Sequence, residues 1–436
     1  MRSRLKFLVL ATALLLPAIG VFGSLSTSAQ DEVAPLKVGV LMPFTGDLSD
    51  FGPSLFNAVE LAANQINEAG GVNGSPIEIV QGDSATAPQQ SVEEARRLIE
   101  IEGVSALIGP AGSGTTLQVA ESVTVPASVL QISPSATTNA LTTLEDNDFF
   151  FRTTIADSAQ GVVMAEVAAT LGYESVCTLY LNNAYGQGLS ATFTGAFTAG
   201  GGTVTAEVPH ESEQASFSSE IGVCTEAGPD ALVAISYPES MSVYLREAIE
   251  SGSVENFLFS DGGRSPDMFA ELGWEPFEGM QGTSAGAPDT TAGADFDTAF
   301  AAAYGELPSL PYLRESYDAM YLIALAAEKA DSVDSVAIRD ALRDVANDPG
   351  EPVGPGVEGW QTAVQLIEEG TEIDYEGAAG GQNFDENGDV LTGTIVIWAI
   401  EGEEVVVVES RDVDLSATGG GDASPEAGEE GTPEAA

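Results

Sequence analysis

From Lys37 onward, short apolar segments alternate with longer amphipathic ones, and this alternation constrains the fold more than any other feature of the sequence. The short runs predict strands, and the segments between them carry apolar residues at helical spacing. Predicted strands occupy residues 36–42, 76–80, 104–109, 128–133, 175–181, 203–208, 230–236 and 256–260. Strands separated by single helices are typical of parallel sheets joined by right-handed crossovers. The sequence therefore predicts an α/β fold with parallel sheets flanked by helices.

The alternation occurs twice along the chain, which predicts two lobes. A chain of 436 residues, 44% of them hydrophobic, is long enough for two or more such units. The pattern begins again after about Ala156, and residues 289–345 are predicted to be mainly helical. Two further apolar segments, 394–400 and 404–410, predict a strand pair. The simplest packing distributes this last part of the chain over both lobes.

The two ends of the chain carry signals of another kind. Residues 1–29 combine a basic start, an apolar run and a small-residue cleavage site, which is typical of an export signal. No cysteine follows the apolar run, so a lipid-anchored cysteine is not expected there, while an uncleaved anchor stays open. Residues 416–436 are rich in Gly, Glu, Pro and Ala, which predicts a disordered acidic tail.

The charge of the chain excludes some classes of partner. With 14 Lys and Arg against 67 Asp and Glu, the formal net charge is −53. Such a surface repels nucleic acid and anionic membranes, because binding by counterion release needs a basic face. The acidity predicts a solvated exterior, and a sharper hypothesis is adaptation to a saline medium that screens self-repulsion.

The chain has two cysteines, Cys177 and Cys224, and both belong to the same predicted lobe. An even number of cysteines in an exported chain favours one disulfide bond. Neither has a His or Cys at ligand spacing, so we expect no metal site at this pair.

Ligands of open parallel sheets bind outside the carboxyl ends of the strands, which directs attention to the strand-to-helix loops. One of them, residues 109–116 (GPAGSGTT), nearly matches a phosphate-binding loop, but Thr115 stands where that loop needs lysine. Cationic residues are almost absent from these loops, Arg264 being the exception. Free N–H groups, a helix N-terminus and hydroxyls without a cation suit one carboxylate rather than a nucleotide.

A second loop rich in hydroxyls, residues 133–138 (SPSATT), follows the next strand of the same lobe. We expect it to converge with the 109–116 loop on one site, because carboxyl ends of parallel strands share a sheet edge. The alternative is an ordinary turn whose hydroxyls cap a helix.

Hydrolase chemistry is the alternative of another class. Ser84 follows a strand in Gly-Asp-Ser, as in one class of esterases, and would need a base within hydrogen-bond reach. The only histidine of the chain, His210, lies in a predicted loop of the other lobe, where a solvent-exposed position is expected. No catalytic residue and no cofactor is therefore predicted.

Seven motifs occur in order along the chain: PFTGDLSDFG, NQINEAGGVNG, GPAGSGTT, ISPSATTNALT, FFFRTTIADSAQG, NNAYGQGL and DALVAISYPES. Together they resemble the extracytoplasmic substrate-binding proteins of ABC importers for branched-chain amino acids, over residues 36–408. The resemblance implies two Rossmann-like lobes, joined by a multi-strand hinge, that close on a ligand between them. It implies a first lobe of residues 36–154 plus 285–383 and a second of residues 155–284 plus 384–412.

The same resemblance implies the ligand contacts. The ligand carboxylate would meet Ser113 and Thr137, and the ammonium would meet the carbonyl of Ser135, the hydroxyl of Thr137 and an acid of the second lobe. The family usually has Glu before Gly as that acid, and here Asp261 before Gly262 takes its place. The implied set is completed by residues lining the cleft, and the full set is Phe51, Ser113, Ser135, Ala136, Thr137, Tyr185, Tyr237 and Asp261.

Together with the export signal, the resemblance implies an exported, monomeric receptor that binds a branched-chain or related aliphatic amino acid and delivers it to an ABC permease. A free amino acid is a zwitterion, so enclosing it requires donors for one pole and an acceptor for the other. Ser236 stands where the family often has an additional aromatic residue, with Tyr237 beside it. A receptor for amides, urea or aromatic acids is therefore the alternative on the same fold.

Overall fold

The computed structural model describes residues 34–416, so the predicted export signal and nearly all of the predicted acidic tail lie outside the described residues. The first four predicted strands and a fifth that was not predicted form a five-stranded parallel sheet with the order β2-β1-β3-β4-β5. Its strands are β1 (Lys37–Met42), β2 (Glu78–Asp83), β3 (Ala106–Ile108), β4 (Leu130–Ser133) and β5 (Phe150–Arg152). We call the part of the chain built on this sheet lobe 1.

The helices that connect these strands include two π-helical stretches. They are α1 (Gly52–Glu68), α2 (Pro88–Arg96), η1 (Arg97–Ile101), α3 (Ser113–Val119), η2 (Ala120–Thr124), α4 (Val125–Ala127) and α5 (Asn139–Thr142). In α1 the buried side chains include Leu55, Val59, Ala62 and Ile66, as the apolar spacing requires of a helix that covers a sheet.

A second sheet of seven strands, which we call lobe 2, has the order β15-β14-β10-β9-β8-β6-β7. Its strands are β6 (Ser175–Leu181), β7 (Thr203–His210), β8 (Ala231–Ile235), β9 (Phe257–Phe259), β10 (Gln281–Gly286), β14 (Thr392–Glu401) and β15 (Glu404–Asp414). The strands from β7 to β10 are parallel, whereas β14 and β15 pair antiparallel. The helical elements of this lobe are α6 (Asp157–Thr170), α7 (Ala184–Ala199), α8 (Ser218–Thr225), α9 (Pro238–Ser251), η3 (Asp261–Gly263), α10 (Pro266–Leu272) and η4 (Glu275–Phe277). The predicted α/β fold with parallel sheets flanked by helices is thus confirmed.

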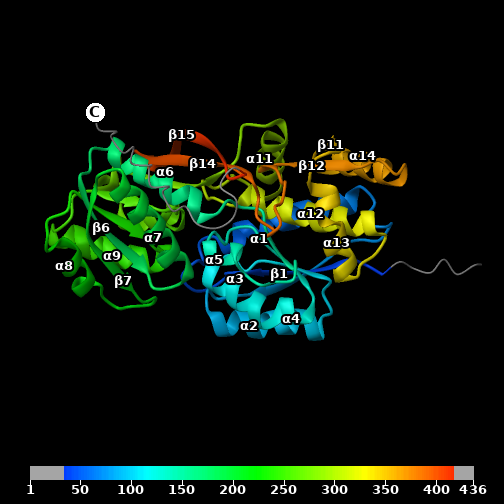
Figure 1. The fold of residues 1–436 in the computed structure, drawn as a ribbon, viewed down its shortest axis with the longest axis horizontal. Coiled ribbons are helices and arrows are strands. Elements are labelled where there is room, and N and C mark those ends of the chain that lie inside the picture. The colour runs from blue at the N-terminus through cyan, green and yellow to red at the C-terminus, as the bar shows by residue number, and fades with distance from the viewer. Residues whose placement is uncertain (1–33, 417–436) are drawn as a thin grey trace, which may run out of the picture. The chain divides into compact units, whose positions relative to one another are not determined.

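The helical region predicted after residue 289 returns to lobe 1 (Figure 1). It contains α11 (Thr291–Tyr304), α12 (Leu313–Ala330), α13 (Ser335–Ala346) and α14 (Gly356–Glu368), with the short strands β11 (Glu351–Val353), β12 (Ile373–Gly377) and β13 (Gly380–Gly381). Helix α12 packs against α1 and α13 and is buried along nearly its whole length. A helix that is apolar on most of its faces is typical of such a central position.

The segment 384–390, which the resemblance places in the second lobe, contacts lobe 1. The guanidinium of Arg152, at the end of β5, forms a buried ion pair with Asp389: its Nε lies 2.6 Å from Oδ1. The ring of Phe384 packs against that of Phe151 with 5.2 Å between the centroids. Strand β14 then enters the sheet of lobe 2, so the chain crosses between the lobes after this segment.

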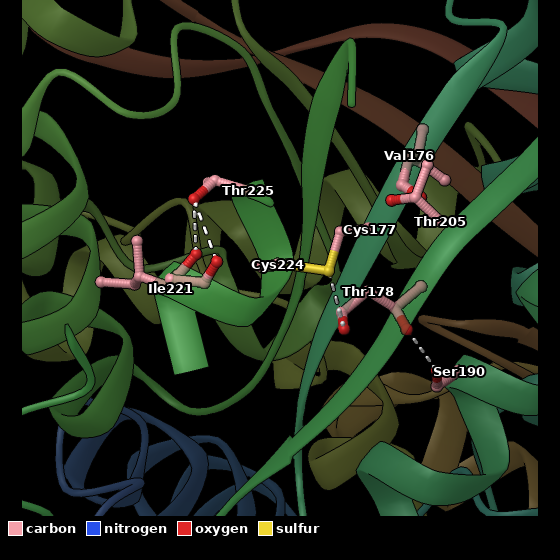
Figure 2. The surroundings of a disulfide bond; sticks show 9 residues. Val176, Cys177, Thr178, Ser190, Thr205, Ile221, Cys224 and Thr225 are labelled. Atoms are coloured by element: carbon pink, nitrogen blue, oxygen red, sulfur yellow. Dashed lines mark hydrogen bonds between the residues drawn. A yellow bond between two sulfur atoms is a disulfide. The ribbon is translucent and has the colours of Figure 1, made fainter. Parts of the chain in front are cut away.

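Cys177 on β6 and Cys224 on α8 form a disulfide bond inside lobe 2, as Figure 2 shows. Both side chains are fully buried, and they lie in an apolar cluster with Leu179, Phe217 and Leu232. The bond ties a helix to the sheet that it covers. Among the described helices, none combines the length and the apolar character needed to cross a bilayer.

Candidate functional site

A narrow cavity lies where loops of the two lobes meet, with a volume of ≈ 20 Å³ in this closed arrangement. Its lining comes from carboxyl-end loops of both sheets, from the start of α1 and from the loop before α12. The lining residues are Leu48, Phe51, Leu55, Ala111, Ser113, Ser135, Tyr185, Tyr237, Asp261, Gly262 and Tyr312. Six of the eight predicted site residues belong to this set, and Ala136 and Thr137 do not.

The 109–116 and 133–138 loops converge on the lobe 1 side of the cavity. Ser113, the first residue of α3, accepts hydrogen bonds through Oγ from the backbone N–H groups of Thr137 (3.2 Å) and Thr138 (3.3 Å). The hydroxyl of Ser135 donates to the carbonyl of Ala111 (3.1 Å). These bonds lock the loops together and leave the hydroxyl hydrogen of Ser113 available to a ligand oxygen.

Thr138 shows that the capping alternative also holds for part of the second loop. Its Oγ1 accepts from the N–H of Ala140 at the start of α5 and donates to the carbonyl of Ala184 in lobe 2 (3.0 Å). Ala136 is fully buried with Ala120, Leu141 and Phe150, so its side chain is a core residue of lobe 1.

Asp261 is the centre of a hydrogen-bond network on the lobe 2 side. Its Oδ1 accepts from the hydroxyl of Tyr185 (2.6 Å) and from Nε2 of Gln160 (2.9 Å). Its Oδ2 accepts from the hydroxyl of Tyr312 (2.6 Å). Three donors hold this buried carboxylate in one orientation, which prepares it to receive a further donor from a ligand.

The aromatic rings of the site come from different elements. Tyr185, near the start of α7, stacks on Tyr237 before α9 with 5.2 Å between the ring centroids. Tyr312 has φ +71°, a left-handed conformation that is uncommon for a residue with a large side chain. This conformation at the start of α12 brings its phenol to Asp261. The sequence analysis missed Tyr312, because nothing in the loop before α12 indicates a ligand contact.

The opposite part of the cavity is apolar. Leu48, Phe51 and Leu55 line it from the loop between β1 and α1 and from the first turns of α1, and Ala111 adds a small side chain. The cavity therefore combines an apolar part with a hydroxyl group on one lobe and a carboxylate on the other. This arrangement suits a small molecule with an aliphatic side chain, an acidic group and a basic group.

Asp157, the first residue of α6, is a second carboxylate in this region that the sequence analysis missed. Its backbone N–H donates to the carbonyl of Thr137 (2.8 Å). Both of its carboxylate oxygens, and Oγ1 of Thr137, are buried without a hydrogen bond of normal length among residues 34–416, although the Thr137 hydroxyl lies near enough to Asp157 to stabilise its charged form. Burial, and then the charge of Asp261, raise the pKa of Asp157 to about 8, while Thr137 and Arg152 act in the opposite direction. An acid in the first turn of a helix is common, which is why the sequence alone did not single it out.

The raised pKa of Asp157 predicts how stability depends on pH. The folded protein holds this proton up to about pH 8, whereas an unfolded Asp loses it near pH 3.9. The contribution of protonated Asp157 to stability is therefore present at low pH, and it is lost as the pH rises toward the pKa of Asp157 in the folded protein. We expect the stability of the wild type, relative to Asp157→Asn, to fall by on the order of 1 kcal/mol per pH unit between pH 5 and pH 8. Urea unfolding at several pH values measures this; parallel pH profiles would contradict it.

The structure also locates the residues of the hydrolase alternative. His210 ends β7 and is 2% exposed, so the prediction that it lies in a solvent-exposed loop is wrong. Its ring packs against Phe217 and Tyr244, with centroid distances of 5.1 and 5.7 Å, and burial lowers its pKa. Strand β7 places it against apolar side chains because it alternates inward with Val208. Ser84 is buried in lobe 1, and its hydroxyl accepts the N–H of Thr86 rather than contacting His210.

Arg264, the one cation noted in the loops, is buried beside the cavity rather than lining it. Its guanidinium donates to the hydroxyls of Ser284 and Ser309, each at 3.1 Å, and burial lowers its pKa to about 10. Within the described part of the chain, no cluster of three His, Cys, Asp or Glu side chains has the arrangement of a metal site.

The family model for periplasmic binding proteins matches residues 35–366. The substrate-binding protein BasB of a chemotactic signal transduction system in Halobacterium salinarum is 27% identical, over 83% of this chain and 86% of that protein. A leucine-, isoleucine-, valine-, threonine- and alanine-binding protein of Pseudomonas aeruginosa is 29% identical, over 75% of this chain and 86% of that protein.

A solved structure supports the same conclusion. The leucine-binding protein LivK of Thermotoga maritima superposes with a TM-score of 0.73 and 26% identity, covering 86% of this chain and 98% of that one. These relatives are substrate-binding proteins rather than enzymes, and the family is extracytoplasmic. The chain belongs to the periplasmic binding protein family, as a type I member of its branched-chain amino acid group.

Proposed function

We propose that the protein captures a small aliphatic amino acid, of the size of leucine, isoleucine or valine, and delivers it to an ABC permease. The observation that carries the proposal is the cavity itself, in which Ser113 of lobe 1 and Asp261 of lobe 2 lie at the boundary of an apolar lining. A zwitterion placed there would direct its carboxylate to Ser113 and the start of α3, and its ammonium to Asp261. Contacts to both lobes would make the ligand stabilise the closed state.

The apolar lining supports an aliphatic side chain. Leu48, Phe51 and Leu55 offer contact surface without a hydrogen-bonding group. Each buried methylene would contribute about 0.8 kcal/mol, so leucine and isoleucine should bind more tightly than alanine. An amide or urea lacks the acidic group that the Ser113 region would receive.

A panel of ligands tests the proposal. Thermal shift and calorimetry should compare leucine, isoleucine, valine and alanine with leucinamide, urea and benzoate. The expected result is tight binding of the branched amino acids and at least tenfold weaker binding of leucinamide. Tighter binding of benzoate, urea or leucinamide than of any free amino acid would contradict it.

Thr137→Val tests the role of the buried Thr137 hydroxyl. The substitution keeps the shape of the side chain and removes Oγ1, which the resemblance places against the ligand ammonium although Thr137 does not line the cavity in this arrangement. Ligand affinity should fall at least tenfold, which is about 1.4 kcal/mol. Thr137→Ser, which keeps the hydroxyl, is the matched control and should stay within about threefold of the wild type. Equal affinities for the wild type and Thr137→Val would remove this residue from the site.

A further inference from the structure

The loop between β1 and α1, residues 43–51, connects the cavity to the surface where the lobes touch. Asp83 anchors it on lobe 1, because this carboxylate accepts from the N–H of Phe44 (3.0 Å) and from the hydroxyl of Thr45 (2.7 Å). Leu48 and Phe51 of the same loop line the cavity. The loop thus covers the apolar side of the proposed ligand.

Two carboxylates of this loop reach lobe 2. Oδ2 of Asp47 accepts from the hydroxyl of Ser240 in the first turn of α9 (3.3 Å). Oδ2 of Asp50 accepts from the hydroxyl of Ser265, the N-cap of α10 (2.6 Å). We call these two contacts the loop seam. Asp47 and Asp50 lie on either side of Leu48 in the sequence, so a movement of Leu48 would displace both contacts.

The loop seam brings acids of opposite lobes together. Lobe 2 presents Glu239 and Glu213 to Asp47, together with the phenol of Tyr237, and Asp83 lies behind the loop on lobe 1. Asp267 and Glu271 face Asp50. None of these described neighbours is a lysine or an arginine, although Glu271 is itself paired with Arg246, whose guanidinium lies 2.7 Å from its carboxylate. The positive end of α9 and the seryl hydroxyls favour the contact, while the like charges oppose it.

Burial of the Asp47 carboxylate also opposes the contact while this group is charged. Asp47 is 5% exposed, and its Oδ1 has no hydrogen-bond partner among the described residues. Burial and then the charge of Glu239 raise the pKa of Asp47 to about 6, against the effect of the Ser240 bond. An exposed Asp in an opened cleft would have a pKa near 3.9. Closure therefore favours the protonated form, and it becomes easier as the pH falls from about 7 toward 4.

We infer that Asp47 and Asp50 are positioning residues that set ligand affinity through closure of the 43–51 loop, and that their negative charge weakens closure at neutral pH. This inference rests on the proposed function for its ligand. Beyond that function, we expect ligand affinity to depend on the protonation of acids that do not touch the ligand, and on how strongly salt screens their charges. Salt should act in the same direction as protonation, because it screens the like charges that face each other.

Asp47→Asn is the first test, because it keeps the acceptor for Ser240 and removes the charge. At pH 8 the variant should bind leucine, or the best ligand of the panel, at least threefold more tightly than the wild type. The ratio of the two affinities should fall at least threefold between pH 8 and pH 5, since the wild-type carboxyl becomes protonated. Taking the ratio cancels titration of Asp157 and of the ligand, which the two proteins share.

Two further variants serve as controls. Ser240→Ala removes the hydrogen bond and leaves the charges, so it should weaken binding about threefold without a change in the melting temperature of the ligand-free protein. Asp344→Asn removes one charge from an exposed position on α13, and its affinity should equal that of the wild type at every pH. An Asp47→Asn to wild-type ratio that is independent of pH, or equal effects of Asp47→Asn and Asp344→Asn, would overturn the inference.

A measurement without ligand separates this inference from the proposed function. Small-angle X-ray scattering of the ligand-free protein should give a smaller radius of gyration for Asp47→Asn than for the wild type at pH 8, with the two values approaching each other at pH 5. If no amino acid binds but this difference is seen, the proposed ligand is wrong and the loop seam stands. If amino acids bind and neither the radius nor the affinity ratio changes, the loop seam is wrong and the proposed function stands.

Discussion

Asp261→Asn is expected to lower amino acid affinity at least a hundredfold. The buried carboxylate accepts hydrogen bonds from Tyr185, Tyr312 and Gln160, and we expect the ligand ammonium to complete its surroundings. Asn keeps the shape but loses the charge, so an ammonium would enter a desolvated site without a counter-charge. Removing one partner of a buried pair typically costs about 3–5 kcal/mol, which corresponds to more than a hundredfold.

Isothermal titration calorimetry with the best ligand of the panel measures this loss. Asp344→Asn, the same chemical change on the exposed surface of α13, is the matched control and should leave affinity unchanged. The melting temperature of ligand-free Asp261→Asn shows whether the variant is folded. A folded variant with wild-type affinity would mean that the ammonium binds elsewhere, and Asp157 would be the next residue to replace.

Reduction of the Cys177–Cys224 bond is expected to lower the free energy of unfolding by about 4 kcal/mol. The two residues are 47 positions apart, and a cross-link over a loop of this length restricts the unfolded chain by about that amount. Because the sulfur atoms are buried in the core of lobe 2, folding in reductant would also leave two thiols in an apolar cluster.

Urea unfolding with and without reductant measures the difference. The double variant Cys177→Ala, Cys224→Ala should show the same stability in both conditions, which controls for other effects of the reductant. Ligand affinity should be unaffected, because the bond lies away from the residues that line the cavity. Equal stabilities of the oxidised and reduced wild type would contradict the prediction.

The site was predictable from the sequence where it depends on the ends of parallel strands. Ser113, Ser135, Tyr185, Tyr237 and Asp261 each lie in a loop that follows a strand or at the start of the next helix. Parallel strands bring their carboxyl ends to one edge of the sheet, so the convergence of these loops follows from the predicted strands alone. The resemblance to a known family then selected residues within these loops, and their contacts with a ligand stay a prediction.

Other parts of the site were not predictable, since they depend on segments distant in the chain. Tyr312 reaches Asp261 only because the helical region after residue 289 folds back onto lobe 1 and the backbone of Tyr312 turns left-handed. Asp157 looked like an ordinary acid at a helix start, and its effect comes from burial beside Thr137 and Asp261. His210 was expected in solvent because the predicted strand ended too early, at residue 208 instead of 210.

The sequence by itself determined the parallel parts of the two α/β sheets, because the spacing of apolar residues fixes which face of each helix and strand is buried. It also determined that the loops at the strand ends offer hydroxyls and an acid with little cationic charge. Only the tertiary structure decided which carboxylates are buried, which tyrosines reach Asp261, and how the acids of the 43–51 loop meet those of lobe 2. Burial and charge proximity between distant segments are properties of packing, and no local pattern of residues encodes them.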